Sequence, residues 1–422
     1  MADGRALLRL IEAERAALLE LLGELVAIPS HASQPSGIVE VGRRVGAELA
    51  ALGFELHSTP PPRAARRVPG WAETVLSPEA GFDELLDPIV WRRPGASSGT
   101  LLLLGDLDVA LALDPVACRI EVRGERAVGP GVADMKGGLA VMIGALRALA
   151  AAGVPAPAVT VVLSGDEQAG SLRSGPIIAA LGETASWCIC LECARDGGRL
   201  MRSRGHIGVG LLRASGVEAH AGSARREGSN AISALAAGLV ALEAPGVSTP
   251  DASVTATILS GGRRRSLVPA AARAVLDVRA RDAGGWSALE SRMRAALAGL
   301  AAAEQLELET FNHRPGLPAT ERTEWLLARV REAGAKIGVQ VAAIDSMAAG
   351  SSAFVDSRRI PVIDGMGPAG GALMTADEYV EVDSIASRAA LLAGTIAGLS
   401  GPGAGLRSGG NWVTSILSSL PS

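Results

Sequence analysis

Apolar runs and helical stretches alternate along most of the chain. Three short runs consist almost entirely of apolar residues, at 100–104, 158–163 and 186–191. Such runs are typical of strands that are buried on both faces of a sheet. Helices are predicted between and around them, at 6–28, 37–52, 137–152 and 321–337. The alternation predicts an α/β fold, with a mostly parallel sheet covered by helices on both faces.

The pattern changes in the middle of the chain. A half-buried strand is expected at 207–216, two more at 253–260 and 272–279, and helices at 229–243 and 284–302. The order β-α-β-β-α-β in about 110 residues indicates a small antiparallel sheet with two helices on one face, a ferredoxin-like α+β unit. We therefore expect residues 206–314 to be a domain inserted into a larger α/β domain, made of 1–205 and 315–400, with a C-terminal tail at 401–422.

Two further segments lie outside this alternation. A short strand is expected near Phe54–Leu56. Residues 59–97 contain three consecutive prolines and several arginines, which indicates a long irregular excursion.

Composition excludes some classes of function. The 422 residues carry a formal net charge of −4 and a pI near 5.9, which gives no reason to expect nucleic-acid binding. We find no secretory signal and no apolar run of membrane-spanning length in the sequence, so a cytoplasmic location without membrane contact is expected. The four cysteines are expected to be buried and reduced, although Cys193, at a strand end, could reach a site.

Three segments place polar residues at the ends of predicted strands or the start of a helix. They are Gly105–Asp108, Gly129–Gly138 and Gly165–Ser171. Zinc sites need imidazole and carboxylate ligands. None of the five histidines falls in these segments.

Together with other motifs, these segments resemble the aminoacylase/desuccinylase family of dinuclear zinc peptidases. The nearest branch is similar to the folate-cleaving glutamate carboxypeptidases. The resemblance spans residues 5–398. The additional motifs are Ala219–Gly222, Ser229–Ile232, Gly261-Gly262, Val268-Pro269 and Asp377–Val380. The resemblance implies that the inserted domain mediates homodimerisation and acts as a lid.

The resemblance also implies which positions would ligate zinc. Asp134 matches the bridging carboxylate and Glu192 a further carboxylate ligand. Where the family has a histidine, a glutamate and another histidine, this chain has Asp106, Gln168 and Met374. Three of the five metal positions have therefore changed.

Two states of this site remain open from the sequence. Asp106, Asp134 and Glu192 supply only oxygens, which suit Mg²⁺, Mn²⁺ or Ca²⁺ better than Zn²⁺. The chain would then hold one hard cation, or no cofactor. In the second case the clustered carboxylates should repel one another, and at least one pKa should rise.

The residues around the expected metal positions match the family pattern more closely than the ligand positions do. By resemblance, Glu167 is the general base, Asp108 orients a ligand, and His220 reaches the oxyanion across a dimer. Arg279 would bind a substrate carboxylate, and Arg314 lies near the substrate. Ser266 and the segment containing Ser352 differ from the family pattern and would change substrate contacts.

Three functions follow from this resemblance. The first is a repurposed enzyme that acts on an amino-acid-like or acyl-amino-acid substrate with a free carboxylate, by acid–base chemistry at Glu167. The second is a non-catalytic protein that binds a ligand or partner. The third is a conventional metal-dependent carboxypeptidase or deacylase.

Overall fold

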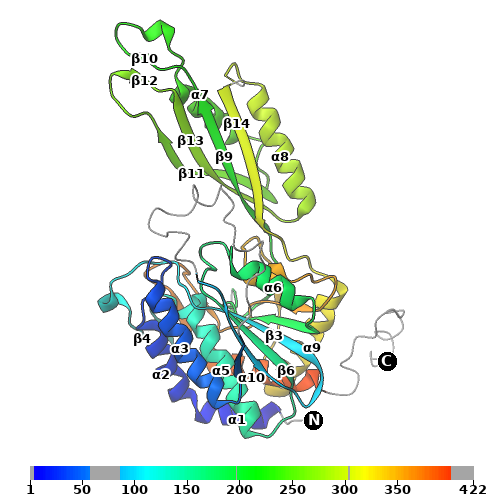
Figure 1. Cartoon of the computed structure of the whole chain (residues 1–422). Helices are drawn as coiled ribbons and strands as arrows, with labels where there is room; N and C mark the ends of the chain where they lie inside the picture. Colours follow the sequence, from blue (N-terminus) through cyan, green and yellow to red (C-terminus); the bar gives the residue numbers. More distant parts are fainter. Residues whose placement is uncertain (1–3, 58–85, 196, 303–304, 401–422) are drawn as a thin grey trace.

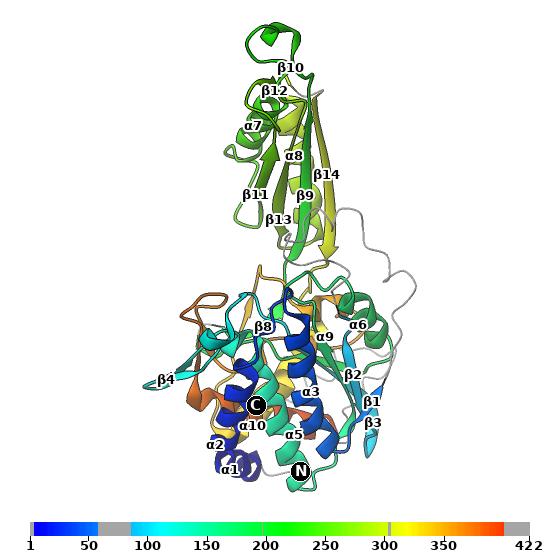
Figure 2. The same ribbon diagram turned by 60° about the vertical axis from the view of Figure 1, so that its left-hand side comes forward.

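The computed structural model describes residues 4–57, 86–195, 197–302 and 305–400. Figures 1 and 2 show a larger α/β layer structure from which a narrower unit extends. The larger part is built on a six-stranded sheet in the order β1-β2-β6-β3-β7-β16. Its strands are β1 (Glu55–His57), β2 (Ile89–Arg93), β3 (Ser97–Asp106), β6 (Pro157–Ser164), β7 (Trp187–Cys190) and β16 (Val362–Ile363).

Strands β6, β3, β7 and β16 pair in parallel. Strands β1 and β2 add an antiparallel edge next to β6. Alternate side chains of the strands enter two different cores. Leu101 and Leu103 pack with the helices of one face, and Leu102 and Leu104 pack on the other face with Ile178 of α6 (Ser174–Gly182). The mostly parallel sheet with helices on both faces is therefore confirmed.

The first face is covered by the long helices. They are α1 (Gly4–Ala13), α2 (Arg15–Val26), α3 (Pro35–Ala51), α5 (Gly137–Ala151), α9 (Glu321–Ile337) and α10 (Val382–Leu399). By length and composition alone α10 could cross a membrane, which the sequence analysis did not anticipate. It packs against α5 and α9 and is 72% buried, which is the environment of a core helix.

Shorter strands complete the larger part. Strands β4 (Glu121–Arg123), β5 (Arg126–Val128), β17 (Gly370–Gly371) and β18 (Tyr379–Glu381) form a four-stranded sheet. Strands β8 (Leu200–Ser203) and β15 (Ala343–Asp345) pair in parallel.

The narrower unit, called the inserted unit below, contains a second four-stranded sheet in the order β11-β13-β9-β14. Its strands β9 (His206–Ser215), β11 (Ala252–Gly261), β13 (Ala271–Ala280) and β14 (Leu306–Arg314) are antiparallel. Helices α7 (Ala231–Leu242) and α8 (Ala283–Ala298) share one core with the sheet. The β-α-β-β-α-β order is thus present. Strands β10 (Ala219–His220) and β12 (Leu267–Val268) pair at its far end.

Two expectations about the N-terminal third were wrong. Residues 6–28 form two helices that separate at Glu14, because α1 packs mainly on α10 whereas α2 packs on α5. Within the expected irregular excursion, residues 89–93 form β2, which pairs with β6 through the backbone despite its two arginines. Residues 59–85 of that excursion and the tail from 401 lie outside the described residues.

Candidate active site

The first candidate residues lie where β3 ends. Asp106 is the last residue of β3 and is 2% exposed. Its Oδ1 accepts a hydrogen bond from Ser351 Oγ at 3.1 Å, whereas Oδ2 has no hydrogen-bond partner among the described residues. Asp108 follows and accepts from the backbone N–H groups of Glu167 at 3.1 Å and Gln168 at 2.8 Å. Asp108 therefore fixes the turn that carries the predicted base.

Glu167 lies beside Asp106 because β6 runs parallel to β3, with Ser164 opposite Asp106. The turn after β6 is closed by the buried Asp166, which accepts from Arg173 N at 2.6 Å. Glu167 is 6% exposed, and its Oε1 pairs with Arg314 Nη1 at 2.6 Å. Arg314 Nη2 also donates to the Glu167 carbonyl at 2.6 Å. Arg314, expected near the substrate, thus holds the predicted base, Glu167.

Asp134 and Glu192 come from two further elements. Asp134 lies in the tight turn η4 (Val132–Lys136) that leads into α5. The Glu378 carboxylate accepts from the N–H groups of Ala133 at 2.8 Å and Asp134 at 2.9 Å, and so holds this turn. Glu192 follows β7 and is 4% exposed.

We call Asp106, Asp108, Asp134, Glu167 and Glu192 the acidic cluster. Burial, and then the neighbouring carboxylates, raise the pKa of Asp106 well above its usual value. Burial also raises the pKa of Asp108 to about 8 and that of Asp134 to about 7. The pKa of Glu192 rises to about 8, again mainly through burial, while Arg204 opposes the rise. Burial is thus the first cause of the raised pKa values, and repulsion among the carboxylates, which the sequence predicted, adds to it.

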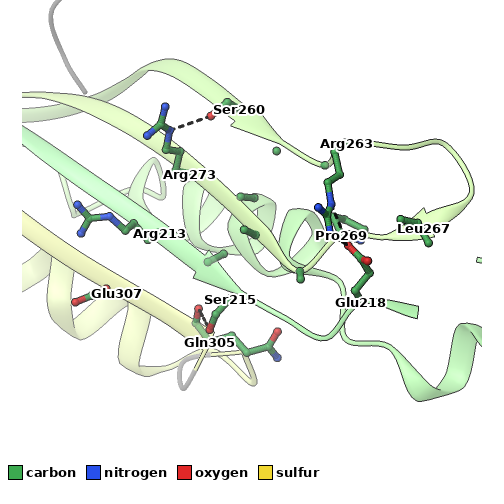
Figure 3. Close-up of a pocket in the computed structure, with 16 residues that line it drawn as sticks. Arg213, Ser215, Glu218, Ser260, Arg263, Leu267, Pro269, Arg273, Gln305 and Glu307 are labelled. Atoms are coloured by element: carbon green, nitrogen blue, oxygen red, sulfur yellow. Dashed lines mark hydrogen bonds and ion pairs between the residues drawn. The ribbon is translucent and has the colours of Figure 1, made fainter. Parts of the chain in front are cut away.

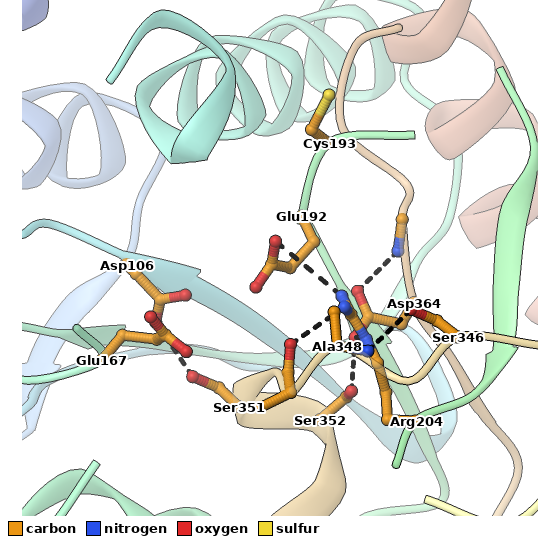
Figure 4. A network of polar contacts seen from close by, with 12 residues as sticks. Asp106, Glu167, Glu192, Cys193, Arg204, Ser346, Ala348, Ser351, Ser352 and Asp364 are labelled. Atoms are coloured by element: carbon orange, nitrogen blue, oxygen red, sulfur yellow. Dashed lines mark hydrogen bonds and ion pairs between the residues drawn. The ribbon is translucent and has the colours of Figure 1, made fainter. Parts of the chain in front are cut away.

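Several residues of this site were missed by the sequence analysis. Arg204 lies near Glu192, and its Nε donates to Asp364 Oδ2 at 2.9 Å (Figure 4). Ser351 binds Asp106, and Glu378 holds the Asp134 turn. Ser352, expected to contact substrate, is fully buried and donates to Asp364. An isolated polar residue leaves no periodic pattern in the sequence. The one available signal for Arg204 was that several buried carboxylates need a positive charge nearby.

A dinuclear zinc centre does not fit these residues. The amide of Gln168 and the thioether of Met374 are poor ligands for Zn²⁺ compared with carboxylate and imidazole. Met374 is 50% exposed. In the arrangement that the structure shows, no three His, Cys, Asp or Glu side chains of the described residues are placed to hold a metal ion, so the acidic cluster would have to rearrange to bind one.

Two further predicted site residues, His220 and Ser266, lie at the far end of the inserted unit, away from the acidic cluster of the same chain. His220 is exposed in β10 at the far end, and its Nδ1 accepts from the N–H groups of Gly222 and Ser223 at 3.1 Å. Ser266 lies beside it, because its carbonyl accepts from Ala221 N at 2.9 Å.

Arg279 lies at the opposite end of the inserted unit, near the larger part. Arg279 and Arg314 both pair in register with Ile207, one on each side of β9. The side chain of Arg279 is 40% exposed and pairs with Asp277 at 2.7 Å. An arginine that can still be reached by solvent therefore lies two strands away from the arginine that holds Glu167.

Cys193 lies beside Glu192 but is fully buried. Burial raises the pKa of its thiol to about 12, so the neutral form dominates at physiological pH. The expected buried, reduced state fits this environment.

A cavity of about 790 Å³ lies on the inserted unit (Figure 3). Its walls carry charges of both signs, including the exposed pair Arg263–Glu218 at 2.6 Å. None of the residues of the acidic cluster lines it, so the candidate chemistry lies elsewhere.

Comparisons with known proteins show which family the chain as a whole resembles. The profile of peptidase family M20/M25/M40 matches residues 102–398. Carboxypeptidase G2 of Pseudomonas sp. (strain RS-16) is 28% identical over 388 residues, which cover 89% of this chain and 87% of that protein. A succinyl-diaminopimelate desuccinylase of Cereibacter sphaeroides is 30% identical over 323 residues, 70% of this chain and 82% of that protein.

Among solved structures, the M20 family metallo-carboxypeptidase Sso-CP2 of Sulfolobus solfataricus superimposes with a TM-score of 0.69 at 15% identity. The match covers 90% of this chain and 99% of that chain. At this identity the likeness supports the fold.

Proposed function

The chain belongs to peptidase family M20/M25/M40, and on that premise we propose a repurposed enzyme that works without a dinuclear zinc centre. It acts on an amino-acid-like substrate with a free carboxylate, and Glu167 is its acid–base centre. The reaction is acyl transfer, amide formation, cyclisation or slow amide hydrolysis. In this proposal residues 206–314 form the dimerisation and lid domain.

The position of Glu167 carries this proposal. Its backbone is held by Asp108, and Arg314 binds Oε1 and the carbonyl, so the carboxylate is fixed at the end of β6. A rigid carboxylate can take a proton from an attacking water or amine and return it to the leaving nitrogen. Arg314 would then hold the carboxylate in place, while the second oxygen exchanges the proton.

Arg279 is the proposed partner of the substrate carboxylate. Its register beside Ile207 brings it to the end of the inserted unit that meets the larger part. An arginine presents two parallel donors that match a carboxylate. When the substrate binds, its carboxylate would replace Asp277 as the partner of Arg279.

A second candidate function is non-catalytic ligand binding. The specific observation in its favour is the buried Arg314–Glu167 pair, since it gives Glu167 a structural role between the inserted unit and the larger part that requires no proton transfer. A conventional zinc carboxypeptidase is disfavoured, because Gln168 and Met374 stand at ligand positions.

The test is turnover of dipeptides and N-acyl amino acids by chelator-treated protein, with products followed by mass spectrometry in the hydrolytic and the synthetic direction. Glu167→Gln should lower kcat on the order of 10²–10⁴-fold. Arg279→Ala should mainly raise KM. The matched control is Glu309→Gln, which changes an exposed glutamate of β14 and should leave turnover unchanged.

Near-normal turnover by Glu167→Gln would exclude the acid–base role. Binding of the same compounds without any turnover by the unaltered protein would favour the non-catalytic function instead.

A further inference from the structure

Arg204 has the most deeply buried guanidinium of the site. It follows β8, where the chain enters the inserted unit, and its side chain is 0% exposed. Its backbone N–H and carbonyl both pair with Leu317 at 2.9 Å, at the point where the chain returns. The residue is therefore fixed between two crossings of the chain.

The surroundings of the guanidinium are shaped to receive it. Nε donates to Asp364 at 2.9 Å, and Nη1 donates to the carbonyl of Ala349 at 2.9 Å. A Cβ at Gly350 would lie 3.1 Å from the guanidinium carbon, so glycine leaves the space that Arg204 fills. Asp364 is in turn held by Ser352 and by the N–H of Gly365.

The third nitrogen points toward the acidic cluster. Nη2 lies 3.8 Å from Glu192 Oε2 and has no hydrogen-bond partner among the described residues (Figure 4). Asp106 Oδ2, in the same cluster, also has no hydrogen-bond partner within the described ranges. A guanidinium stays protonated in proteins, so this positive charge is permanent. Asp364 and Glu192 raise the pKa of Arg204 against the opposing effect of burial.

A divalent ion would compete with this charge. An ion bound by Asp106, Asp134 and Glu192 would share the Glu192 carboxylate with Arg204. Two like charges at such short separation repel strongly in a buried site. The carboxylates would also have to lose the protons that burial favours.

We propose that Arg204 is the resident cation of the acidic cluster: held by Asp364, it supplies the positive charge beside Glu192 and excludes a divalent ion from Asp106, Asp134 and Glu192. The inference rests on the proposed function only in treating the acidic cluster as the working site. Of the two states that the sequence left open, the proposal favours the one without a metal.

The experiment measures Mn²⁺ and Zn²⁺ binding to the full chain by calorimetry and equilibrium dialysis after treatment with chelator. The unaltered protein should take up no stoichiometric ion at micromolar concentrations. Arg204→Met removes the charge at similar length, and it should bind one Mn²⁺ at least about tenfold more tightly than the unaltered protein. Its Tm should rise when Mn²⁺ is added.

Two further variants locate the effect. Arg204→Lys retains the positive charge and should exclude the ion as the unaltered protein does. In Arg204→Met/Asp106→Asn, the gained Mn²⁺ binding should be lost. Arg213→Met, an exposed arginine of β9, is the control and should bind no ion.

One ion per chain in the unaltered protein, lost in Asp106→Asn, would overturn the proposal even if Arg204→Met failed to fold. Failure of Arg204→Met, when folded, to gain binding would also overturn it. Neither result depends on turnover, so the acid–base role of Glu167 is judged separately.

Discussion

At the scale of single residues, the Arg314–Glu167 pair joins the inserted unit to the candidate base. Both side chains are less than a tenth exposed, and the guanidinium also binds a backbone carbonyl. Removing one partner of a buried pair leaves an uncompensated charge, which costs about 3–5 kcal/mol. The pair therefore fixes the candidate base and couples it to β14 of the inserted unit.

Arg314→Met should lower the free energy of unfolding by about 3–5 kcal/mol in urea titrations. Arg314→Met/Glu167→Gln should recover part of this loss, because the neutral amide needs no counter-charge. Equal stability of the single and double variants would show that the two side chains are not coupled. The exposed pair Arg213–Glu309 offers a control cycle, with an expected coupling below about 1 kcal/mol.

The acidic cluster also predicts how stability depends on pH. Glu192 has a pKa of about 8 in the folded protein, whereas glutamate in unfolded chains titrates near 4.3. Between these values the folded state holds a proton that the unfolded state has released. The contribution of Glu192 is therefore most favourable below about pH 4 and is lost as the pH rises toward 8.

The substitution Glu192→Gln replaces the titrating carboxyl group with an amide, so the folded state no longer holds the extra proton. Unfolding free energies measured in urea at pH 5, 6 and 7 should fall less steeply for Glu192→Gln than for the unaltered protein, by about 1.4 kcal/mol per pH unit. Glu309→Gln, which is exposed, should keep the original slope. An unchanged slope in Glu192→Gln would mean that this carboxyl is ionised across the range.

At the scale of elements, the site depends on how closely helix α5 approaches the end of β7. A Cβ at Gly138, in the first turn of α5, would lie 2.0 Å from the carbonyl oxygen of Leu191. Leu191 precedes Glu192, and Gly138 follows Asp134 by four residues. The absence of a side chain at Gly138 thus lets two carboxylates of the cluster come together.

Gly138→Ala should destabilise the protein by about 3 kcal/mol, because backbone atoms must move to admit the methyl group. Gly23→Ala is the matched control, since Gly23 also lies within a helix and a Cβ added there would meet no atom within 4 Å. It should stabilise by about 0.5–1 kcal/mol through helix propensity. Thermal unfolding of both variants distinguishes the effects, and a stable Gly138→Ala would contradict the close approach.

The sequence predicted those elements whose pattern reflects their own burial. The apolar runs at 100–104 and 158–163 identify β3 and β6 because both faces of these strands are covered. The break at Glu14 and the strand β2 were missed, because they depend on which neighbour each segment packs against. Arg204 and Asp364 were missed for the same reason, since a partner 160 residues away leaves no local pattern.

At the scale of the whole molecule, His220 lies at the far end of the inserted unit, away from the acidic cluster of its own chain. If His220 takes part in the reaction, it must serve the site of another copy. The inserted unit also carries an exposed apolar surface. Ile232 and Val240 of α7 are 41% and 75% exposed, and Ile258 and Leu259 of the edge strand β11 are 48% and 65% exposed.

We therefore expect a homodimer that joins these surfaces, since an open apolar edge strand is a ready partner for a second copy of itself. Light scattering at micromolar concentration should give twice the chain mass of 42.8 kDa. Leu259→Lys combined with Val240→Glu places charges on this surface and should yield a folded monomer. Val122→Glu changes an equally apolar valine, 55% exposed on β4 of the larger part, and should leave the dimer intact. A monomeric unaltered protein would contradict the reach of His220 into the site of another copy, and the reaction would then rest on Glu167 and the two arginines beside Ile207.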